Sequence, residues 1–268
     1  MAKSVRPWPH EAKCNYEMVT TRGTQRLTLA ESGGYMTKRM TLRDGVLNAL
    51  GRTYTLRQKD LGTDAHLAAK GMAFETESWE VVGVGHLCVM QMNAFFGLMR
   101  METAIIAPTA VDAPLFNLDW VKALGTETQI AELYDTQLVP WPEECHDAFE
   151  FVRAQYADVP DAPAGDARWY DDVLYPCSFH KKGRELIGRK GLTERMSRAA
   201  QDYLTVYAEL LEAARPCDQA EKSARVRAFA ERLFEEGGPA VDQVTRLFGG
   251  QTAKRLILQH MYGVHPSE

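Results

Sequence analysis

Hydrophobic and polar positions alternate along several short stretches in the first half of the chain. From Met101 to Ala107 the two kinds of residue change places at nearly every step, until Pro108 ends the run. Ser78–Asn93 is rich in β-branched residues, and Gln129–Leu138 also has the pattern of a strand. Because short loops join these stretches, we expect the strands to pair antiparallel.

In the last third of the chain the hydrophobic spacing changes to three and four, which predicts helices. Thr193–Ala214 carries an apolar face of this kind, with Thr193 as its expected N-cap. Ala220–Glu235 follows, and the glycine pair 237–238 ends it before Pro239 begins the last helix. Two shorter helices are expected at Met36–Leu50 and Glu143–Tyr156.

The length of the chain, 268 residues, suits one large domain or two small ones. The strongest loop signal is the segment 158–169, which is rich in proline and aspartate and reads as a domain linker or as a long surface loop. We expect the loop, and therefore one domain over residues 1–268. Residues 1–35 are polar and irregular, so we expect them to form a loosely structured N-terminal segment.

Composition and charge exclude several classes of protein. A net charge of −5 does not indicate binding to nucleic acid. The chain also contains no run of eighteen apolar residues, which a membrane span would need. The first residues lack the apolar core of a signal peptide. Five scattered cysteines without a C-x-x-C pair favour free thiols in a reducing cytoplasm, so we expect a cytoplasmic protein.

Histidine and cysteine spacing gives no support for a metal site. The seven histidines show neither H-x-H nor H-x-x-x-H spacing, and the cysteines form no zinc or iron–sulfur motif. We therefore expect no metal ligands, and we expect His86 to be a hydrogen-bonded structural residue.

Two aspartates flank an apolar segment after the strand that ends at Pro108. Asp112 and Asp119 enclose the sequence APLFNL, and apolar neighbours raise the pKa of a carboxyl, which can then hold a proton near neutral pH. Each aspartate also has a structural interpretation. Asp112 would close an Asx-turn before Pro114, and Asp119 would be the N-cap of a helix.

A strongly basic run lies between residues 181 and 198 of this acidic protein. It holds seven lysines and arginines against Glu185 and Glu194. Such a run is either a solvated face or a docking patch for an acidic protein. For docking we single out Lys181, Lys182, Arg189 and Lys190.

Three stretches, in order, resemble the ferredoxin-dependent bilin reductases and their relative, red chlorophyll catabolite reductase. The segment from Asp112 to Asp119 resembles the family's D-x-P loop and its closing acid. Trp169–Phe179 is similar to a family segment that runs as a strand along the pigment cavity, although Tyr170 stands where the family has glycine. The ending from Pro239 matches the family's last helix at Pro239, Ala240, Leu247, Phe248, Gly249 and Ala253.

The resemblance implies a fold and a reaction. It implies an α/β protein, a three-layer α/β/α sandwich with a central mostly antiparallel sheet, whose cavity lies between the sheet and the C-terminal helices. It further implies that single electrons from ferredoxin reduce a double bond of an open-chain tetrapyrrole such as biliverdin. No flavin or nicotinamide is implied, no cofactor is held permanently, and no G-x-G-x-x-G is present.

Residue roles follow from the same resemblance. Asp119 is expected to be the main proton donor and Glu102 the second, while the substrate would be bound by Thr103, Asp112, Phe116, Phe179 and Arg184. Because neighbouring strand residues point to opposite faces, only one of Glu102 and Thr103 can face a cavity. Gly238 stands where several bilin reductases carry a second aspartate.

Two alternatives to this function stay open from the sequence. The missing aspartate at Gly238 favours a protein that binds heme or a bilin without turnover. A reductase of a different conjugated ring system is the other alternative.

Overall fold

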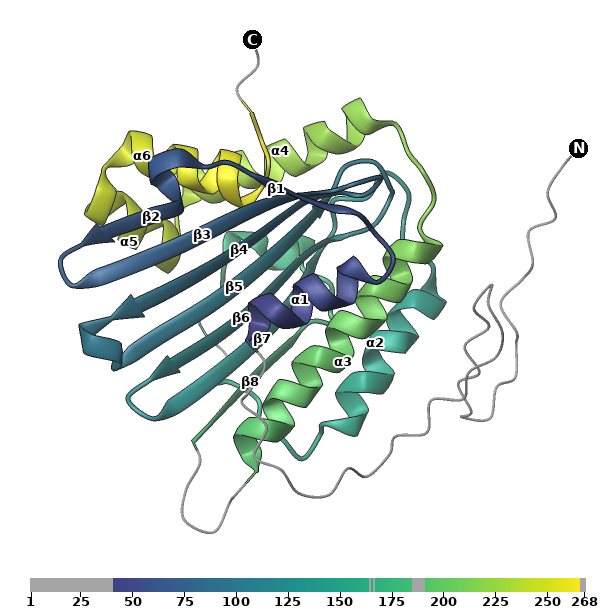
Figure 1. The fold of residues 1–268 in the computed structure, drawn as a ribbon. Helices are drawn as coiled ribbons and strands as arrows, with labels where there is room; N and C mark the ends of the chain where they lie inside the picture. Colours follow the sequence, from purple (N-terminus) through teal and green to yellow (C-terminus); the bar gives the residue numbers. More distant parts are fainter. Residues whose placement is uncertain (1–40, 164, 166, 185–190, 266–268) are drawn as a thin grey trace, which may run out of the picture. The chain divides into compact units, whose positions relative to one another are not determined.

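An eight-stranded antiparallel sheet runs through the computed structural model, which describes residues 41–163, 165, 167–184 and 191–265. Its strands lie side by side in the order β1, β3, β4, β5, β6, β7, β8, and β2 also pairs with β3 (Figure 1). The sheet is therefore mostly antiparallel, and with its helices it belongs to the predicted α/β class. The strands are β1 Leu56–Lys59, β2 His66–Ala69, β3 Met72–Val81, β4 Gly85–Ala94, β5 Met99–Pro108, β6 Leu115–Ala123, β7 Thr126–Tyr134 and β8 Phe179–Arg184.

The helices of the described residues are α-helices and shorter helical segments. The α-helices are α1 Leu42–Gly51, α2 Glu143–Gln155, α3 Leu192–Ala213, α4 Gln219–Glu236, α5 Pro239–Phe248 and α6 Gly250–Lys254. Short 3-10 helices are η1 Gly62–Ala65, η2 Phe95–Gly97 and η3 Trp169–Val173, and η4 Arg255–Met261 is π-helical. The described residues belong to one compact unit, Met40–Glu268, and the predicted segment 1–35 lies outside them.

The strand that was expected over Ser78–Asn93 is in fact parts of β3 and β4, joined by a tight turn. Gly85 begins β4 so close to β5 that a Cβ there would lie 2.3 Å from the carbonyl oxygen of Ala107. A residue without a side chain is therefore required at this point of the sheet.

The segment after Pro108 is only partly a loop, which corrects the sequence-based expectation. Residues from Leu115 onward form β6, and Asp119 lies in the middle of that strand. The interpretation of Asp119 as a helix N-cap is therefore wrong. Phe116, Leu118 and Trp120 alternate with polar neighbours in the period of a strand, but Pro114 and the two aspartates made the segment look like a loop.

Two helical predictions need adjustment at their ends. Helix α3 begins at Leu192 with Gly191, not Thr193, in the N-cap position. The expected long last helix divides at Gly249, where a φ of 81° ends α5 before α6 and η4 begin. This φ lies in the left-handed region that glycine adopts without steric cost.

The segment Trp169–Phe179 was expected to be a strand, and most of it is not. Trp169–Val173 forms the 3-10 helix η3, which is closed by a hydrogen bond of 2.8 Å from the Arg168 backbone N–H to the Asp171 carboxylate. Only its last residue, Phe179, belongs to β8. A carboxylate that caps a first turn stabilises a helix, which outweighs the strand-like apolar residues here.

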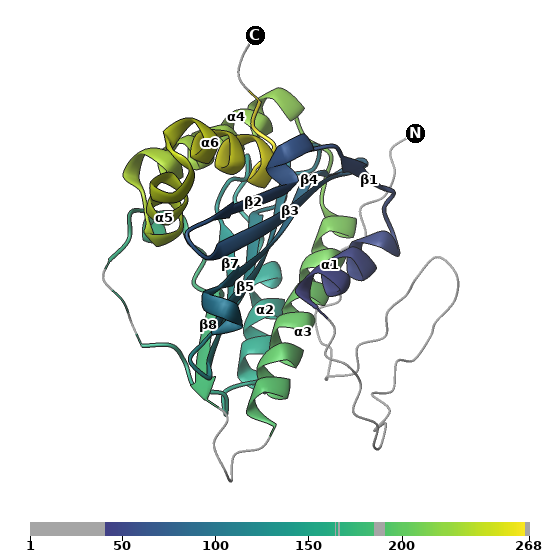
Figure 2. The same ribbon diagram turned by 60° about the vertical axis from the view of Figure 1, so that its left-hand side comes forward.

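Each face of the sheet packs against different helices. Phe116, Leu133 and Phe179 point to one face, here called the α3 face, where Tyr203 and Tyr207 of α3 cover them. Ile105, Leu115 and Tyr134 point to the other face, against α4 and η4. Figure 2 shows α1 and α3 on one side of the strands and α4, α5 and α6 on the other.

A polar cluster fixes η4 to the sheet. The carbonyl oxygen of His260 accepts hydrogen bonds of 2.8 Å from Ser78 Oγ and from His86 Nε2. The ring of His260 in turn lies 2.9 Å from the Asp64 carboxylate, which also pairs with Arg255. His86 is buried, its pKa is lowered to about 3 mainly by that burial, and its role is structural, as expected.

Candidate functional site

One row of side chains crosses four strands on the face opposite α3. Strand register pairs Thr103 with Asp119, Asp119 with Ile130, and Ile130 with His180. Because directly paired residues of antiparallel strands point to the same side, these four side chains share one face. We call it the Asp119 face.

The carboxyl of Asp119, a partly buried residue, is held by two buried neighbours. Thr103 Oγ1 donates a hydrogen bond of 2.6 Å to one carboxyl oxygen, and Asn117 Nδ2 donates one of 2.8 Å to the other. Burial raises the pKa of Asp119 to about 6, against the lowering effect of these two hydrogen bonds. A repulsion from Glu132 adds to the rise. Asp119 can therefore carry a proton close to neutral pH.

Glu132 is the second carboxyl of this face, and it is surrounded by donors. Tyr134 donates to it at 2.5 Å, Arg168 lies 3.3 Å away, and His180 Nε2 lies 2.9 Å away. Burial opposes its ionisation, but the contacts with His180 and Tyr134 outweigh burial and lower the pKa of Glu132. Glu132 is thus a buried carboxylate that stays charged.

Asn117 joins the two carboxyls. Its Nδ2 atom donates to Asp119 at 2.8 Å and lies 3.4 Å from Glu132 Oε2. The two carboxyls have pKa values shifted in opposite directions, which is the usual arrangement where one group exchanges a proton and the other supplies fixed charge. Such a division suits proton transfer to a bound molecule.

The sequence did not single out Asn117, Glu132, Arg168 or His180. Glu132 lies within the predicted strand Gln129–Leu138, between apolar neighbours, and a carboxylate inside such a run was an available signal. Its partner Arg168 is the N-cap of η3 and its partner His180 lies in β8; both are distant in sequence, and the strand register brings His180 beside it.

Glu102 does not share a face with Asp119. It pairs with Trp120 and points to the opposite side, where its carboxylate accepts a hydrogen bond of 2.6 Å from the backbone N–H of Leu42. Leu42 is the first residue of α1, so Glu102 satisfies one of the free amide groups of that helix. Thr103 is the residue that faces Asp119, and the expectation of Glu102 as a second proton donor is corrected.

Phe116 and Phe179, expected to contact substrate, belong to the core of the α3 face. Phe116 stacks on Tyr207 with ring centroids 4.4 Å apart, and Phe179 packs on Tyr203 at 4.5 Å. Each is the strand neighbour of a residue that points to the Asp119 face. Because side chains alternate between the two faces of a strand, both point to the other side of the sheet.

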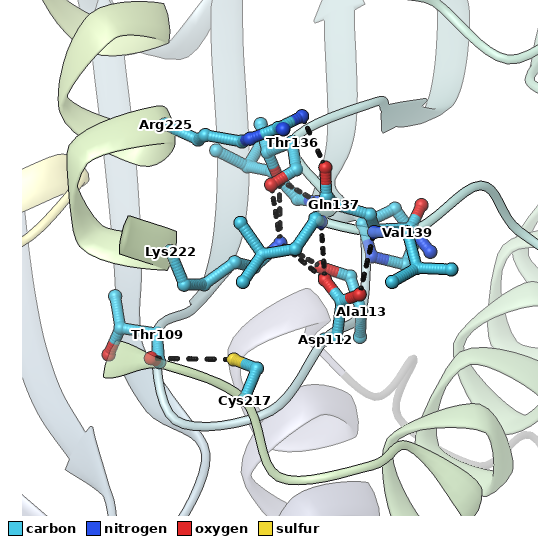
Figure 3. Close-up of polar contacts among 12 residues, drawn as sticks. Thr109, Asp112, Ala113, Thr136, Gln137, Val139, Cys217, Lys222 and Arg225 are labelled. Carbon is cyan, nitrogen blue, oxygen red and sulfur yellow. Dashed lines mark hydrogen bonds and ion pairs between the residues drawn. The ribbon is translucent and has the colours of Figure 1, made fainter. Parts of the chain in front are cut away.

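Asp112 forms the centre of a buried structural cluster instead of an Asx-turn or a binding site. Its two carboxylate oxygens accept hydrogen bonds from the backbone N–H groups of Leu138, at 2.8 Å, and Val139, at 3.0 Å. Lys222 of α4 lies 3.7 Å from the same carboxylate (Figure 3). Both oxygens serve the backbone, so the expectation that Asp112 binds substrate is corrected.

Lys222 is fully buried and connects α4 to two chain segments at this end of the sheet. Its Nζ atom donates to the carbonyl oxygens of Ala113 and Thr136, each at 2.7 Å, and lies 3.2 Å from Thr136 Oγ1. Burial lowers its pKa to about 8, and the nearby Asp112 opposes that change. The D-A-P segment therefore serves to fix α4 in place.

The predicted docking residues divide into different groups. Lys181 is buried on the α3 face, where its Nζ donates to the Val159 carbonyl oxygen at 3.0 Å and pairs with Asp161 at 2.7 Å, so it offers no surface charge. Lys182 and Arg184 are exposed, and the strand register places them on the Asp119 face. Arg189 and Lys190 lie outside the described residues.

Three further observations concern metal ligands, membrane spans and the position of Gly238. They contain no group of three or more histidine, cysteine, aspartate or glutamate side chains placed to hold a metal ion. None of their helices is both long and apolar enough to cross a membrane. Gly238 is the N-cap of α5, with open space where a side chain would be.

Comparison with known proteins finds similarity in structure but not in sequence. No protein-family model matches the sequence, and no curated protein sequence matches it either. Among solved structures, the chain is similar to phytochromobilin synthase from tomato, determined in complex with biliverdin, with a TM-score of 0.65. The two sequences are 14% identical, and the match covers 83% of each chain. The chain has the fold of this enzyme. At such low identity the likeness concerns the fold alone.

We predict that Thr103→Val raises the pKa of Asp119 above its value of about 6, because the substitution removes a hydrogen bond that favours the carboxylate. Valine keeps the shape of threonine, so the strand pairing should persist. Titration of the Asp119 side-chain carbon by nuclear magnetic resonance measures the change. Thr128→Val, on the same face but outside the pair, is the matched control. An unchanged Asp119 pKa in Thr103→Val would contradict the role of this hydrogen bond.

Proposed function

We propose that this protein reduces a double bond of an open-chain tetrapyrrole of the biliverdin type, with Asp119 as the proton donor. The observation that carries the proposal is a carboxyl whose pKa burial raises to about 6, in the middle of a sheet with the fold of a bilin-binding enzyme. A general acid works best when its pKa lies near the operating pH. Asp119 has this property.

The tetrapyrrole would lie against the part of the Asp119 face that the helices leave partly exposed. Met101, Val121 and Ile130 supply apolar contact there, and all three are partly exposed. Lys182 and Arg184 are exposed on the same face and would pair with the carboxylates of the pigment. An apolar surface with a few charged groups at its margin suits a flat conjugated ligand with acidic side chains.

Reduction of one double bond requires two electrons and two protons. We propose that the electrons arrive singly from ferredoxin, without a resident flavin or nicotinamide. Asp119 delivers a proton to the pigment and takes up another from solvent before the second transfer. Glu132 keeps its negative charge beside the site, favours the protonated form of Asp119, and is held by His180 and Arg168. No second carboxyl is required.

The test is to mix the purified chain with biliverdin and chemically reduced ferredoxin under anaerobic conditions. We expect the visible absorption band to shift progressively with time, and mass spectrometry to show a product heavier than biliverdin by two hydrogens. Omission of ferredoxin is the control and should give only the immediate change caused by binding. If the complete mixture also gives only that immediate change, the protein is a tetrapyrrole-binding protein and the proposed reaction is wrong.

A further inference from the structure

Three turns lie at one end of the sheet, and two of them carry a concentration of exposed apolar side chains. They join β2 to β3, β4 to β5 and β6 to β7, and they lie along the left side of the sheet in Figure 1. Phe96 is fully exposed, and the exposed fractions of Leu124, Leu98 and Phe95 are 76%, 61% and 51%. Only Val139 and Phe151, elsewhere, are comparable among large apolar residues of the described chain.

Backbone hydrogen bonds make these turns one continuous edge. The N–H of Phe95 donates to the carbonyl oxygen of Gly71 at 3.3 Å, and the N–H of Leu124 donates to that of Leu98 at 3.3 Å. The exposed side chains therefore form one patch, here called the turn patch, which consists of Phe95, Phe96, Leu98 and Leu124 together with Lys70.

The backbone of the turn patch places residues with side chains in the left-handed region. Four non-glycine residues of the described chain have a positive φ, and all of them lie here: Lys70, Phe95, Phe96 and Leu124. The pairs Lys70–Gly71 and Leu124–Gly125 form two-residue turns with both φ values positive, for which asparagine is the favoured first residue. Leucine and phenylalanine instead cost both left-handed strain and exposure, and such costs persist where a side chain has a function.

The charges around the turn patch are mainly positive. Across residues 69–72, 93–100, 122–127 and 184 there are four basic residues and one acidic residue, Glu127. Lys70, Arg100 and Arg184 are exposed, and Arg184 lies against the turn at Gly125. Glu127 is buried and pairs with Lys122 at 3.0 Å. The patch thus combines protruding apolar groups with a positive margin.

We propose that the turn patch docks the protein on an anionic lipid bilayer. Apolar side chains on protruding turns can enter the headgroup region of a bilayer, and nearby lysine and arginine side chains add attraction to anionic lipids. A shallow, open depression lies between the first two turns and is lined by Lys70, Met72 and Asn93 among others. Four apolar side chains on two turns supply too little area for a stable protein interface, which buries roughly 800 Å² on each partner. This inference does not depend on the proposed function.

Cosedimentation of the full chain with lipid vesicles tests this proposal. We expect binding to vesicles of phosphatidylcholine mixed with phosphatidylserine, weaker binding in high salt, and little binding to phosphatidylcholine alone. The variant Phe96→Asn with Leu124→Asn should bind at least about 10-fold more weakly, because it loses the inserted side chains. Asparagine tolerates the left-handed backbone, so the melting temperature of this variant should be unchanged or higher.

Val139→Asn is the matched control, since it removes a large apolar side chain that is 65% exposed away from the turn patch. It should leave vesicle binding unchanged. A wild-type chain that does not sediment with the anionic vesicles would overturn the proposal, as would an equal effect of Val139→Asn and the double variant. If the patch serves an acidic protein or a second copy of the chain, the anionic vesicles will fail to sediment it, and the proposal falls in the same way.

Discussion

Asp119→Asn should lower the rate of tetrapyrrole reduction by roughly 100-fold or more, which is the usual contribution of a general acid. Asparagine keeps the size of the side chain and can still bond Thr103 and Asn117, but it has no proton to give. Tetrapyrrole affinity should change little. The reaction catalysed by wild-type protein should also slow as the pH rises above about 6, because the protonated fraction of Asp119 falls. The variant should lack this dependence.

Single-turnover absorption spectroscopy across pH, with reduced ferredoxin in excess, measures both effects. Asp172→Asn is the matched control, because Asp172 is an exposed aspartate in η3. The melting temperature separates loss of chemistry from loss of fold. A carboxyl whose pKa is raised in the native state costs stability above that pKa, so Asp119→Asn should not melt earlier than wild type at neutral pH. Full activity in Asp119→Asn would disprove the assignment.

Lys222→Met should have the largest effect on stability, a loss of about 3 kcal/mol or more in the free energy of unfolding. Methionine preserves the apolar stem of lysine but leaves the carbonyl oxygens of Ala113 and Thr136 without their donor. Buried acceptors left without partners cost about 1–3 kcal/mol each, and the carboxylate of Asp112 also loses its buried cation.

Urea denaturation at neutral pH gives the change in free energy. Arg227→Met is the matched control, on the same helix, because Arg227 is partly exposed and only 3.9 Å from Glu231 in a surface pair. Such pairs contribute about 0.3–0.5 kcal/mol. If Lys222→Met and Arg227→Met unfold at the same urea concentration, the buried lysine does not hold α4 to the sheet.

The sequence predicted the elements more successfully than the direction of their side chains. Alternation found most of β5, and spacing of three and four found α3 and α4, because these signals are local. The position of Asp119 in β6 was hidden by the proline and acidic residues around it. Which residues of neighbouring strands point to the same face depends on the register between the strands, and residues far along the chain determine that register.

The candidate site shows the same limit. Asp119 could be predicted as a site residue because its apolar neighbours and its resemblance to a known loop both lie in one short segment. The sequence could not show which of Glu102 and Thr103 points toward Asp119, because this depends on which of them faces α1. Glu132 could be recognised only with the positions of Arg168 and His180. Lys181 was predicted at the surface, but it is buried and pairs with Asp161 in the loop after α2.

Strands β3 to β7 each pair with the strand that precedes them, through connections of two to six residues. Contacts between neighbours in sequence form early, so this meander can assemble hairpin by hairpin as the chain leaves the ribosome. Thr103, Asp119 and Glu132 would then come together in the order of synthesis. Arg168 and His180 are made later, and α4 with η4 later still. The carboxylate of Glu132 is thus solvated by water when it is made, and it acquires Arg168 and His180 as partners only when the second half of the chain arrives.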